Sequence, residues 1–238
     1  MNPNTSDDQP REESGASWGV AKRLLLVAFS ILFHGTLLFV SAGSLNWTMA
    51  WAFLGLYATN GIVIVLLINP DLMAERAKTK ADAKGWDKVL SGFLRLSLLT
   101  APLVAGMDMR WDWSPQLQPA VQLAALVVGA LGYGLNAWAI TTNRFFSAVV
   151  RIQKDRGHAV VSTGPYQYVR HPGYVGSMMV ALAIPLILGS LWAYVPAVLG
   201  ELLFIVRTAL EDRTLHEELD EYSEYAQQTR YRLLPGIW

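Results

Sequence analysis

Long stretches without a formal charge alternate with short polar segments along the chain. No Asp, Glu, Lys or Arg occurs in residues 24–70, and only Arg95 interrupts the apolar run 89–107. Because about 20 apolar residues suffice for a helix to cross ~30 Å of hydrocarbon, the stretch 24–70 has room for two spans. The turn-forming segment 41–47 separates them. The runs 89–107 and 113–143 predict a third and a fourth span.

A further uncharged stretch, residues 173–200, follows in the second half of the chain. Gly189 and Ser190, with Pro185 and Pro196 on either side, should break this region into two half-length helices that form a hairpin. The sequence therefore predicts an all-α protein. Its architecture should be a polytopic integral membrane helix bundle of five to six spans, closed by this C-terminal helical hairpin.

Composition agrees with a membrane protein and excludes several kinds of site. Hydrophobic residues make up 53% of the chain and charged residues 16%, against about 25% charged in soluble domains. Cysteine is absent, which excludes disulfides, thiolate metal sites and a cysteine nucleophile, and we predict no metal site. The net charge is zero and no basic, aromatic surface pattern is present, so we expect no nucleic-acid partner.

Basic residues set the predicted orientation. The loop between the second and third spans contains Arg76, Lys78, Lys80, Lys84 and Lys88, whereas the loop between the first and second spans contains no basic residue. By the positive-inside rule, this loop, both termini and the connection 144–170 should lie in the cytoplasm. We expect a multi-pass protein of a bacterial inner membrane or its equivalent, with membrane lipids around it. The oligomeric state stays open.

One polar segment between two apolar regions has the composition of a binding site. Residues 163–176 read TGPYQYVRHPGYVG. Charge bias between loops accounts for Arg170, but not for a histidine fixed between that arginine and Pro172 with a tyrosine three residues further on. A guanidinium, an imidazole that titrates near neutrality and aromatic rings are suited to binding a small molecule.

An acidic pair, Glu211 and Asp212, follows the last apolar stretch. We expect this pair to lie at the same membrane depth as Arg170 and His171 and to face them across one cleft. Acidic and basic groups in one cleft favour a ligand with both charges. S-adenosylmethionine is such a ligand, because it has a carboxylate, an ammonium group, ribose hydroxyls and an adenine ring.

The second half of the chain resembles the isoprenylcysteine carboxyl methyltransferase and phospholipid methyltransferase family of integral membrane enzymes. The resemblance depends on GPYQYVRHPGYVG at 164–176, the lead-in HAVV at 158–161 and the tail beyond residue 210. In that family, the motif GxYxxxRHPxYxG and a Glu-Glu pair bind S-adenosylmethionine. The positions that match, and that we expect to bind this cofactor, are His158, Val160, Gly164, Tyr166, Arg170, His171, Pro172, Tyr174, Glu211 and Asp212. Asp212 departs from the family's second Glu and shortens its reach.

The resemblance implies an S-adenosylmethionine-dependent methyltransferase that acts on a lipophilic small molecule or lipid. The carboxylate of an isoprenylcysteine-like substrate is the expected acceptor, by O-methylation. We divide the chain into a disordered polar tail (1–17), a four-span membrane region (18–141) and a cytoplasmic cofactor-binding cap with the hairpin and an amphipathic tail (142–238). The candidate catalytic residues are Arg170, Arg207 and Glu211.

Arg207 lies inside the last apolar stretch, where a buried charge needs a partner or an anionic substrate. We expect it either to orient the acceptor or to pair with Glu211 at the next helical turn. Glu201 is a second acid in the same stretch, with a structural or a catalytic role. Gly132 and Gly134 serve either close helix packing or a motif of the phospholipid branch.

Several other functions stay open from the sequence. The acceptor could be a phospholipid amine or a small thiol. A membrane reductase with a nicotinamide cofactor has a similar carboxy-terminal arrangement, although a 2′-phosphate would require more basic residues. A non-enzymatic protein could also retain this scaffold. No GxGxxG motif follows a predicted strand, which excludes a soluble α/β methyltransferase domain.

Overall fold

The computed structural model describes residues 9–69, 72 and 83–238. Across these residues the regular elements are all helical, so the all-α fold class is confirmed. The long helices are α1 (Gln9–Ala42), α2 (Thr48–Leu67), α4 (Gly85–Trp111), α5 (Pro119–Thr142), α6 (Pro172–Leu188) and α7 (Tyr194–Glu218). Two 3-10 turns and a short helix complete the described part: η1 (Lys154–Arg156), η2 (Gly164–Gln167) and α8 (Tyr222–Gln228).

Four of the described helices are long and apolar enough to cross a membrane: Val20–Ala42 within α1, and all of α2, α4 and α5. They coincide with the first four predicted spans. Large apolar side chains cover the outer surface of α1, where Leu25, Phe29 and Leu32 are 67–70% exposed. Side chains of this kind are stable when they face lipid, so the protein is an integral membrane protein.

The predicted C-terminal hairpin is present, but its second arm is longer than expected. Gly189 ends α6 in the left-handed conformation (φ 75°), and α7 begins five residues later. Pro196 does not interrupt α7, because a proline in the first helical turn removes an N–H that has no partner there. The expectation of two half-length helices is therefore wrong: α6 has 17 residues and α7 has 25.

The predicted amphipathic surface tail is also corrected. Residues after 210 continue α7 as far as Glu218 instead of forming a separate helix. No proline or glycine follows Gly200 before that point, so nothing in the backbone stops the helix where the apolar stretch ends. The chain reverses only at Glu221, which has a positive φ of 65°, and α8 then folds back against α7.

The amino-terminal segment differs from the predicted disordered tail. α1 begins at Gln9, so residues 9–17 are helical, and residues 1–8 lie outside the described part. Extending an existing helix adds one hydrogen bond per residue, so a polar composition alone is a poor guide next to a long helix. Arg76, Lys78 and Lys80, which contributed to the predicted orientation, also lie outside the described residues.

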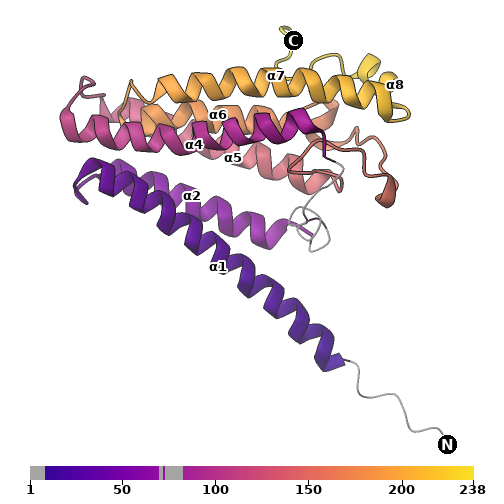
Figure 1. The fold of residues 1–238 in the computed structure, drawn as a ribbon, viewed down its shortest axis with the longest axis horizontal. Helices are drawn as coiled ribbons and strands as arrows, with labels where there is room; N and C mark the ends of the chain where they lie inside the picture. Colours follow the sequence, from indigo (N-terminus) through magenta and orange to yellow (C-terminus); the bar gives the residue numbers. More distant parts are fainter. Residues whose placement is uncertain (1–8, 70–71, 73–82) are drawn as a thin grey trace, which may run out of the picture.

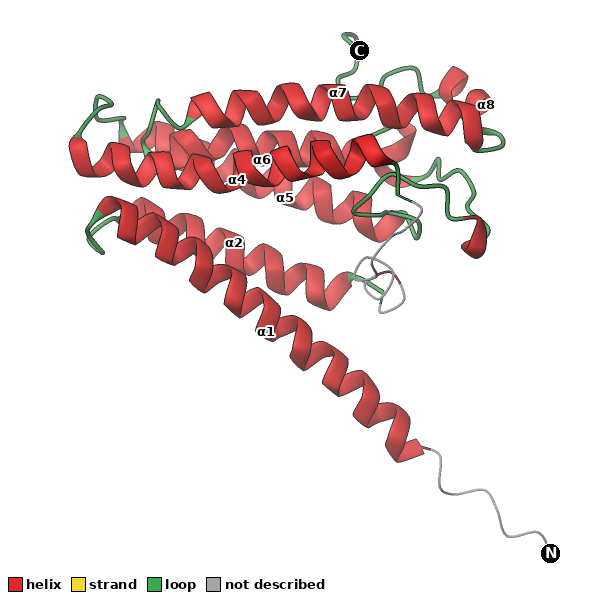
Figure 2. Ribbon diagram, viewed as in Figure 1, coloured by secondary structure: helices red, strands yellow, loops and turns green. Residues whose placement is uncertain are grey.

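Figures 1 and 2 show how the helices are arranged. The helices α4, α5, α6 and α7 lie side by side, α2 packs below them, and the amino-terminal half of α1 extends away from the bundle. The loops 43–47, 112–118 and 189–193 gather at one end of the bundle. The long connection 143–171 and the turn between α7 and α8 gather at the other end, which is called the cap end below.

Close contact between α5 and α6 positions the polar motif. A side chain on Gly132 would come within 2.8 Å of the Gly176 carbonyl oxygen, so the two backbones touch. The packing interpretation is thus confirmed for Gly132, whereas Gly134 has open space around it. The Asn136 side chain donates hydrogen bonds to the Gly173 carbonyl (2.9 Å) and to Ser177 (2.9 Å). These contacts fix the first turn of α6, where the motif ends.

Candidate active site

A cleft opens at the cap end, between the connection 143–171, the start of α6 and the end of α7. It encloses about 800 Å³ of empty space, including the solvent at its open mouth. One wall is aromatic and aliphatic and contains Phe146, Val160, Leu215, Tyr222 and Tyr225. Charged and polar groups share the rest of the lining, so the cleft can hold a molecule with a ring system and charged ends.

The polar motif folds into the cleft wall through its glycine and tyrosines. Gly164 has a positive φ of 57°, and a side chain there would crowd the Thr142 hydroxyl at 3.0 Å. The turn η2 that follows buries Tyr166, whose hydroxyl donates to the Ala139 carbonyl (3.3 Å). The Tyr225 hydroxyl in turn donates to the Tyr166 carbonyl (2.6 Å). Burial raises the pKa of Tyr225 to about 12, so this phenol keeps its proton at neutral pH.

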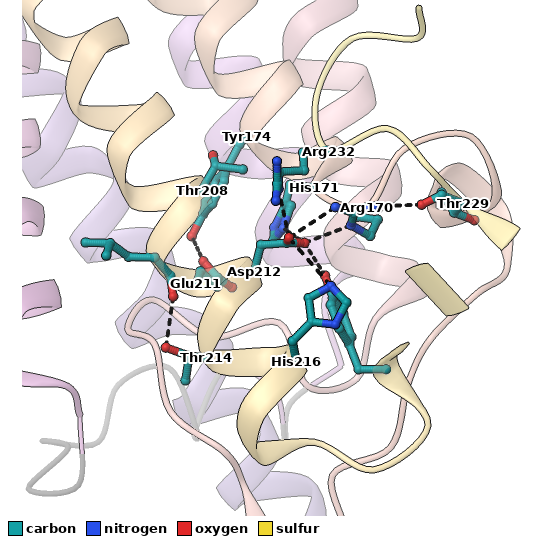
Figure 3. A network of polar contacts seen from close by, with 12 residues as sticks. Arg170, His171, Tyr174, Thr208, Glu211, Asp212, Thr214, His216, Thr229 and Arg232 are labelled. Carbon is teal, nitrogen blue, oxygen red and sulfur yellow. Dashed lines mark hydrogen bonds and ion pairs between the residues drawn. The ribbon is translucent and has the colours of Figure 1, made fainter. Parts of the chain in front are cut away.

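Asp212 is the centre of a buried polar network (Figure 3). Its side chain is 1% exposed. Arg170 donates to both carboxylate oxygens (2.7 and 3.1 Å), and Arg232 (2.8 Å) and the Tyr222 hydroxyl (2.8 Å) donate to one oxygen each. The His171 Nε2 lies 3.4 Å from the same carboxylate. Asp212 therefore binds protein groups and is turned away from the cleft.

The segment 229–232 completes the coordination of Arg170. Its Nη1 donates to the carbonyls of Thr229 (2.9 Å) and Arg230 (2.8 Å). The backbone N–H groups of Arg170 and His171 donate to the carbonyls of Tyr231 and Arg232. The chain after α8 is thus hydrogen-bonded along the motif, and Asp212 and these carbonyls accept four hydrogen bonds from the Arg170 guanidinium.

Glu211 points into the cleft from the residue before Asp212. Its carboxylate accepts a hydrogen bond from the Tyr174 hydroxyl. The Tyr174 ring stacks on His171, with 5.6 Å between ring centroids and 5° between planes. Glu211, Tyr174 and His171 all line the cleft. They place a carboxylate, a phenol and an imidazole next to each other at its inner end.

Arg207 is paired with an acid that the sequence did not single out. Its Nε donates to Asp87 of α4 (2.7 Å), and its Nη2 donates to the Ala148 carbonyl (3.3 Å). Asp87 is 0% exposed and also accepts from the backbone N–H of Val150 (2.8 Å). Arg207 therefore serves the contact between α4, α7 and the connection, and its ion pair is with Asp87, not with Glu211. Its predicted role in orienting the acceptor stays a prediction.

His158 lies beside a cluster of cations on the connection. Its Nδ1 accepts a hydrogen bond from the Gln153 N–H (3.3 Å), which leaves the proton of the neutral ring on Nε2. Partial burial, followed by the nearby positive charges of Arg151 and Arg156, lowers its pKa from 6.5 to about 4. The ring is therefore neutral at physiological pH, and its Nε2–H is able to donate a hydrogen bond at the cleft.

The structure gathers most of the predicted site residues around one cleft. Those that line it are His158, Val160, Tyr166, Arg170, His171, Tyr174 and Glu211. Gly164, Pro172, Asp212 and Arg207 lie behind the lining: Gly164 and Pro172 shape the backbone, and the other two form buried ion pairs. The role of each residue in binding stays a prediction. Glu201 is buried on α7 away from the cleft, and neither of its carboxylate oxygens has a hydrogen-bond partner in the described part of the chain.

Sequence reasoning missed Asp87 and Arg151. Arg151 lines the cleft and was interpreted as one of several ordinary loop cations. Asp87 could have been found from charge balance, because it begins an apolar run at the cap end and Arg207 requires a buried counter-ion. For Arg151 no sequence signal distinguishes it from Lys154 or Arg156; only the fold buries it.

Comparisons with known proteins give matches to parts of the chain. Residues 123–217 match the model of the isoprenylcysteine carboxyl methyltransferase (ICMT) family. The chain is 37% identical over 70 residues to the protein-S-isoprenylcysteine O-methyltransferase of Schizosaccharomyces pombe, a match that covers 29% of this chain and 30% of the relative. It is 34% identical over 147 residues to the cobalt-zinc-cadmium resistance protein CzcN of Cupriavidus metallidurans, covering 56% of this chain and 57% of the relative.

A solved structure of a eukaryotic intramembrane Ras methyltransferase, ICMT, is similar over most of the chain. The comparison has a TM-score of 0.45 and 20% sequence identity, and it covers 90% of this chain and 85% of the other. The sequence matches are shorter: they span 30% and 57% of the two curated relatives described above.

We predict that the Asp87–Arg207 pair stabilises the fold and that its two members depend on each other. Asp87→Leu or Arg207→Met alone leaves a buried charge without its partner and should cost about 3–5 kcal/mol, seen as a lower melting temperature in detergent. The double variant should cost clearly less than the sum of the single variants, although the Val150 N–H then loses its acceptor. Lys88→Met, which removes an exposed cation of the same helix, is the control. Additive losses would show that the two residues act independently.

We also predict a pH dependence that comes from His158. Because its pKa is lower in the folded protein than the ordinary 6.5, protonation favours the unfolded chain. Its contribution to stability is complete above pH 6.5 and is lost as the pH falls towards 4. The melting temperature of the wild type should therefore fall more steeply over this range than that of His158→Gln. Parallel pH profiles for the two proteins would contradict the prediction.

Proposed function

Because residues 123–217 match the model of the isoprenylcysteine carboxyl methyltransferase family, we propose that the protein is a membrane methyltransferase that uses S-adenosylmethionine. The proposed reaction is O-methylation of the carboxylate of a lipophilic, isoprenylcysteine-like acceptor. The observation that carries the proposal is the cleft itself. Glu211, Tyr174 and His171 meet there at the depth where α6 and α7 leave the apolar part of the bundle.

The residues of the cleft fit the chemistry of the cofactor. Glu211 offers a carboxylate to an ammonium group or to ribose hydroxyls. Phe146, Tyr222 and Leu215 form an apolar and aromatic wall against which an adenine ring can pack. The His158 Nε2 adds a neutral donor. The adenine ring of S-adenosylmethionine and its ammonium group or ribose hydroxyls therefore have suitable groups among the lining residues.

When bound, S-adenosylmethionine supplies an electrophilic methyl group on a sulfonium. A carboxylate acceptor is already ionised at neutral pH, so the protein needs no general base for it. The protein then has to exclude water and to hold the acceptor oxygen in line with the bond between the sulfur and the methyl group. The packed cap and the rigid Asp212 network suit this task, because they fix Arg170 and His171 before any ligand arrives.

Binding and methyl transfer test this proposal directly. Purified protein in detergent should bind S-adenosylmethionine and S-adenosylhomocysteine in calorimetry. Glu211→Gln should weaken that binding by about tenfold or more, because a charge-assisted hydrogen bond is lost. Glu217→Gln is the matched control, since this glutamate lies on the same helix but is exposed and paired with Arg213. A well-folded wild-type protein that binds neither compound would refute the cofactor assignment.

The acceptor is tested with labelled methyl groups. N-acetyl-S-farnesylcysteine should accept the label, whereas its methyl ester should not, because it has no free carboxylate. Vesicles of phosphatidylethanolamine and a small alkyl thiol test the amine and thiol alternatives in the same assay. Transfer to one of these, and none to the farnesylated acid, would replace the proposed acceptor with another class.

We further propose that the cap end faces the cytoplasm. The described cations Lys84, Lys88 and Arg144 lie at that end, whereas Arg110 lies near the opposite loops. The chain has no cysteine, so single cysteines report the orientation without a background. Lys154→Cys should react with an impermeant maleimide only in inside-out vesicles, and Ser44→Cys only in right-side-out vesicles. The reverse pattern would place the cap on the outer side.

A further inference from the structure

A groove separates α1 from α2 on the side of the cap end, where α1 diverges from the bundle (Figure 1). It encloses about 660 Å³ of empty space, including its open mouth. Leu26 of α1 and Ile64 and Val65 of α2 form much of its apolar lining. The groove shares no lining residue with the cap-end cleft, so the proposed methyl transfer gives it no role.

Contacts between α1 and α2 close the base of this groove. The hydroxyl groups of Ser30 and Tyr57 share a hydrogen bond (2.7 Å). A side chain on Gly61 would come within 2.7 Å of a Val27 methyl carbon, so Val27 packs directly on the α2 backbone. The mouth opens to lipid, because Leu26 at the groove is 60% exposed within a helix that is apolar enough to cross the membrane. The groove is therefore a lipid-facing hollow with a fixed floor.

Arg23 lies at the cap-end side of the groove and has no counter-ion there. It is the last charged residue before the uncharged stretch 24–70, so its guanidinium lies where hydrocarbon meets the lipid headgroups. Its side chain has no hydrogen bond or ion pair to any residue that the structure describes, and none of the described residues that line the groove is acidic. A guanidinium at this depth binds an anion well, and phosphate is the anion that lipids supply there.

Asn60 adds an amide deeper in the groove. Its neighbour Gly61 contacts Val27, so the amide lies about one helical turn further into the membrane than Arg23. Within the described part of the chain the Asn60 side chain has no hydrogen-bond partner either. An amide without a partner costs free energy in hydrocarbon, so a polar residue at this place in a span indicates a ligand. The ester carbonyls of a glycerolipid lie below its phosphate and can accept from such an amide.

We propose that this groove binds one anionic phospholipid. The phosphate binds Arg23, an ester carbonyl accepts a hydrogen bond from Asn60, and an acyl chain packs on Leu26 and Ile64. Charge favours an anionic lipid over a zwitterionic one, because a zwitterionic headgroup brings a cation to a guanidinium and finds no acid in the lining. The site does not depend on the proposed methyl transfer.

Native mass spectrometry of the protein released from detergent tests the role of the charge. The wild type should bind one dioleoylphosphatidylglycerol about tenfold or more tightly than dioleoylphosphatidylcholine, which has the same acyl chains. Arg23→Gln should weaken phosphatidylglycerol by about tenfold or more, because a charge-assisted contact is lost. Lys22→Gln is the matched control, since this neighbouring cation is exposed and does not line the groove. Equal losses in the two variants would reduce the effect to attraction by any basic residue at the membrane surface, and would overturn the site.

A tryptophan placed in the groove tests the seat of the acyl chain without a change of charge. Leu26→Trp should occupy part of the groove and weaken phosphatidylglycerol by about tenfold. Leu25→Trp should leave the affinity unchanged, because Leu25 is 70% exposed on the same helix and does not line the groove. Melting temperatures in detergent show that both variants are folded. The same affinity in both variants would place the lipid outside the groove.

Asn60→Leu separates a ligand-binding amide from a structural one. Without lipid the variant should keep or raise its melting temperature, because an amide without a partner is removed from an apolar span. Its affinity for phosphatidylglycerol should nevertheless fall by about threefold to tenfold. A lower melting temperature with unchanged lipid affinity would show that Asn60 serves the helix pair, and would remove it from the site.

Competition identifies the occupant. Inorganic phosphate in large excess should not displace phosphatidylglycerol, because it has no apolar part to fill the groove; displacement would reassign Arg23 to a soluble anion. N-acetyl-S-farnesylcysteine should not displace the lipid either. Displacement by this farnesylated acid would assign the groove to the methyl acceptor and overturn the lipid site. A failure to bind S-adenosylmethionine would refute the proposed function and leave this site unaffected.

Discussion

One buried carboxylate holds the cap end together. Asp212 receives hydrogen bonds from the motif (Arg170), from α8 (Tyr222) and from the segment after α8 (Arg232). The motif is far in the sequence from α8 and the segment that follows it, and Tyr166 of the motif also packs against Tyr222 and Tyr225 of α8. A buried carboxylate is stable only when donors surround it, so the folded cap requires all of them at once. The shape of the cleft follows from this requirement, because the same elements form its walls.

A second buried acid attaches the cap to the membrane bundle. Asp87 begins α4, binds Arg207 of α7 and accepts the Val150 N–H of the connection. The Lys84 N–H donates to the Val150 carbonyl, so both the N–H and the C=O of Val150 are hydrogen-bonded to residues at the start of α4. Residues 149–151 are therefore anchored to α4, and Arg151 is kept at the cleft although it lies in an irregular segment. Asp212 thus holds the motif in place, and Asp87 positions the opposite wall of the cleft.

The sequence was most informative where a single strong physical effect dominates. The absence of charges from 24–70 and 113–143 predicted the spans, because a charge in hydrocarbon is expensive wherever it lies. The motif 163–176 predicted the cleft, because a loop that only connects two helices does not need an arginine, a histidine and several tyrosines together. The end of α7 was missed because leaving the bilayer does not oblige a helix to stop. The partner of Arg207 was missed because pairing at i and i+4 is visible in a sequence, whereas the real pair joins residues 120 positions apart.

The pair Glu211-Asp212 illustrates what a sequence motif leaves undetermined. The resemblance assigned both acids to the cofactor, yet neighbouring residues on an α-helix point about 100° apart, since a turn takes about 3.6 residues. When Glu211 faces the cleft, Asp212 must face the motif and α8 instead, as Figure 3 shows. The shorter side chain suits that place, because Arg170, Arg232 and Tyr222 reach its oxygens at 2.7–3.1 Å. An extra methylene would push the carboxylate into these donors. The departure from a Glu-Glu pair thus fits two separate positions: the first acid faces the cleft, and the second holds the residues that form it.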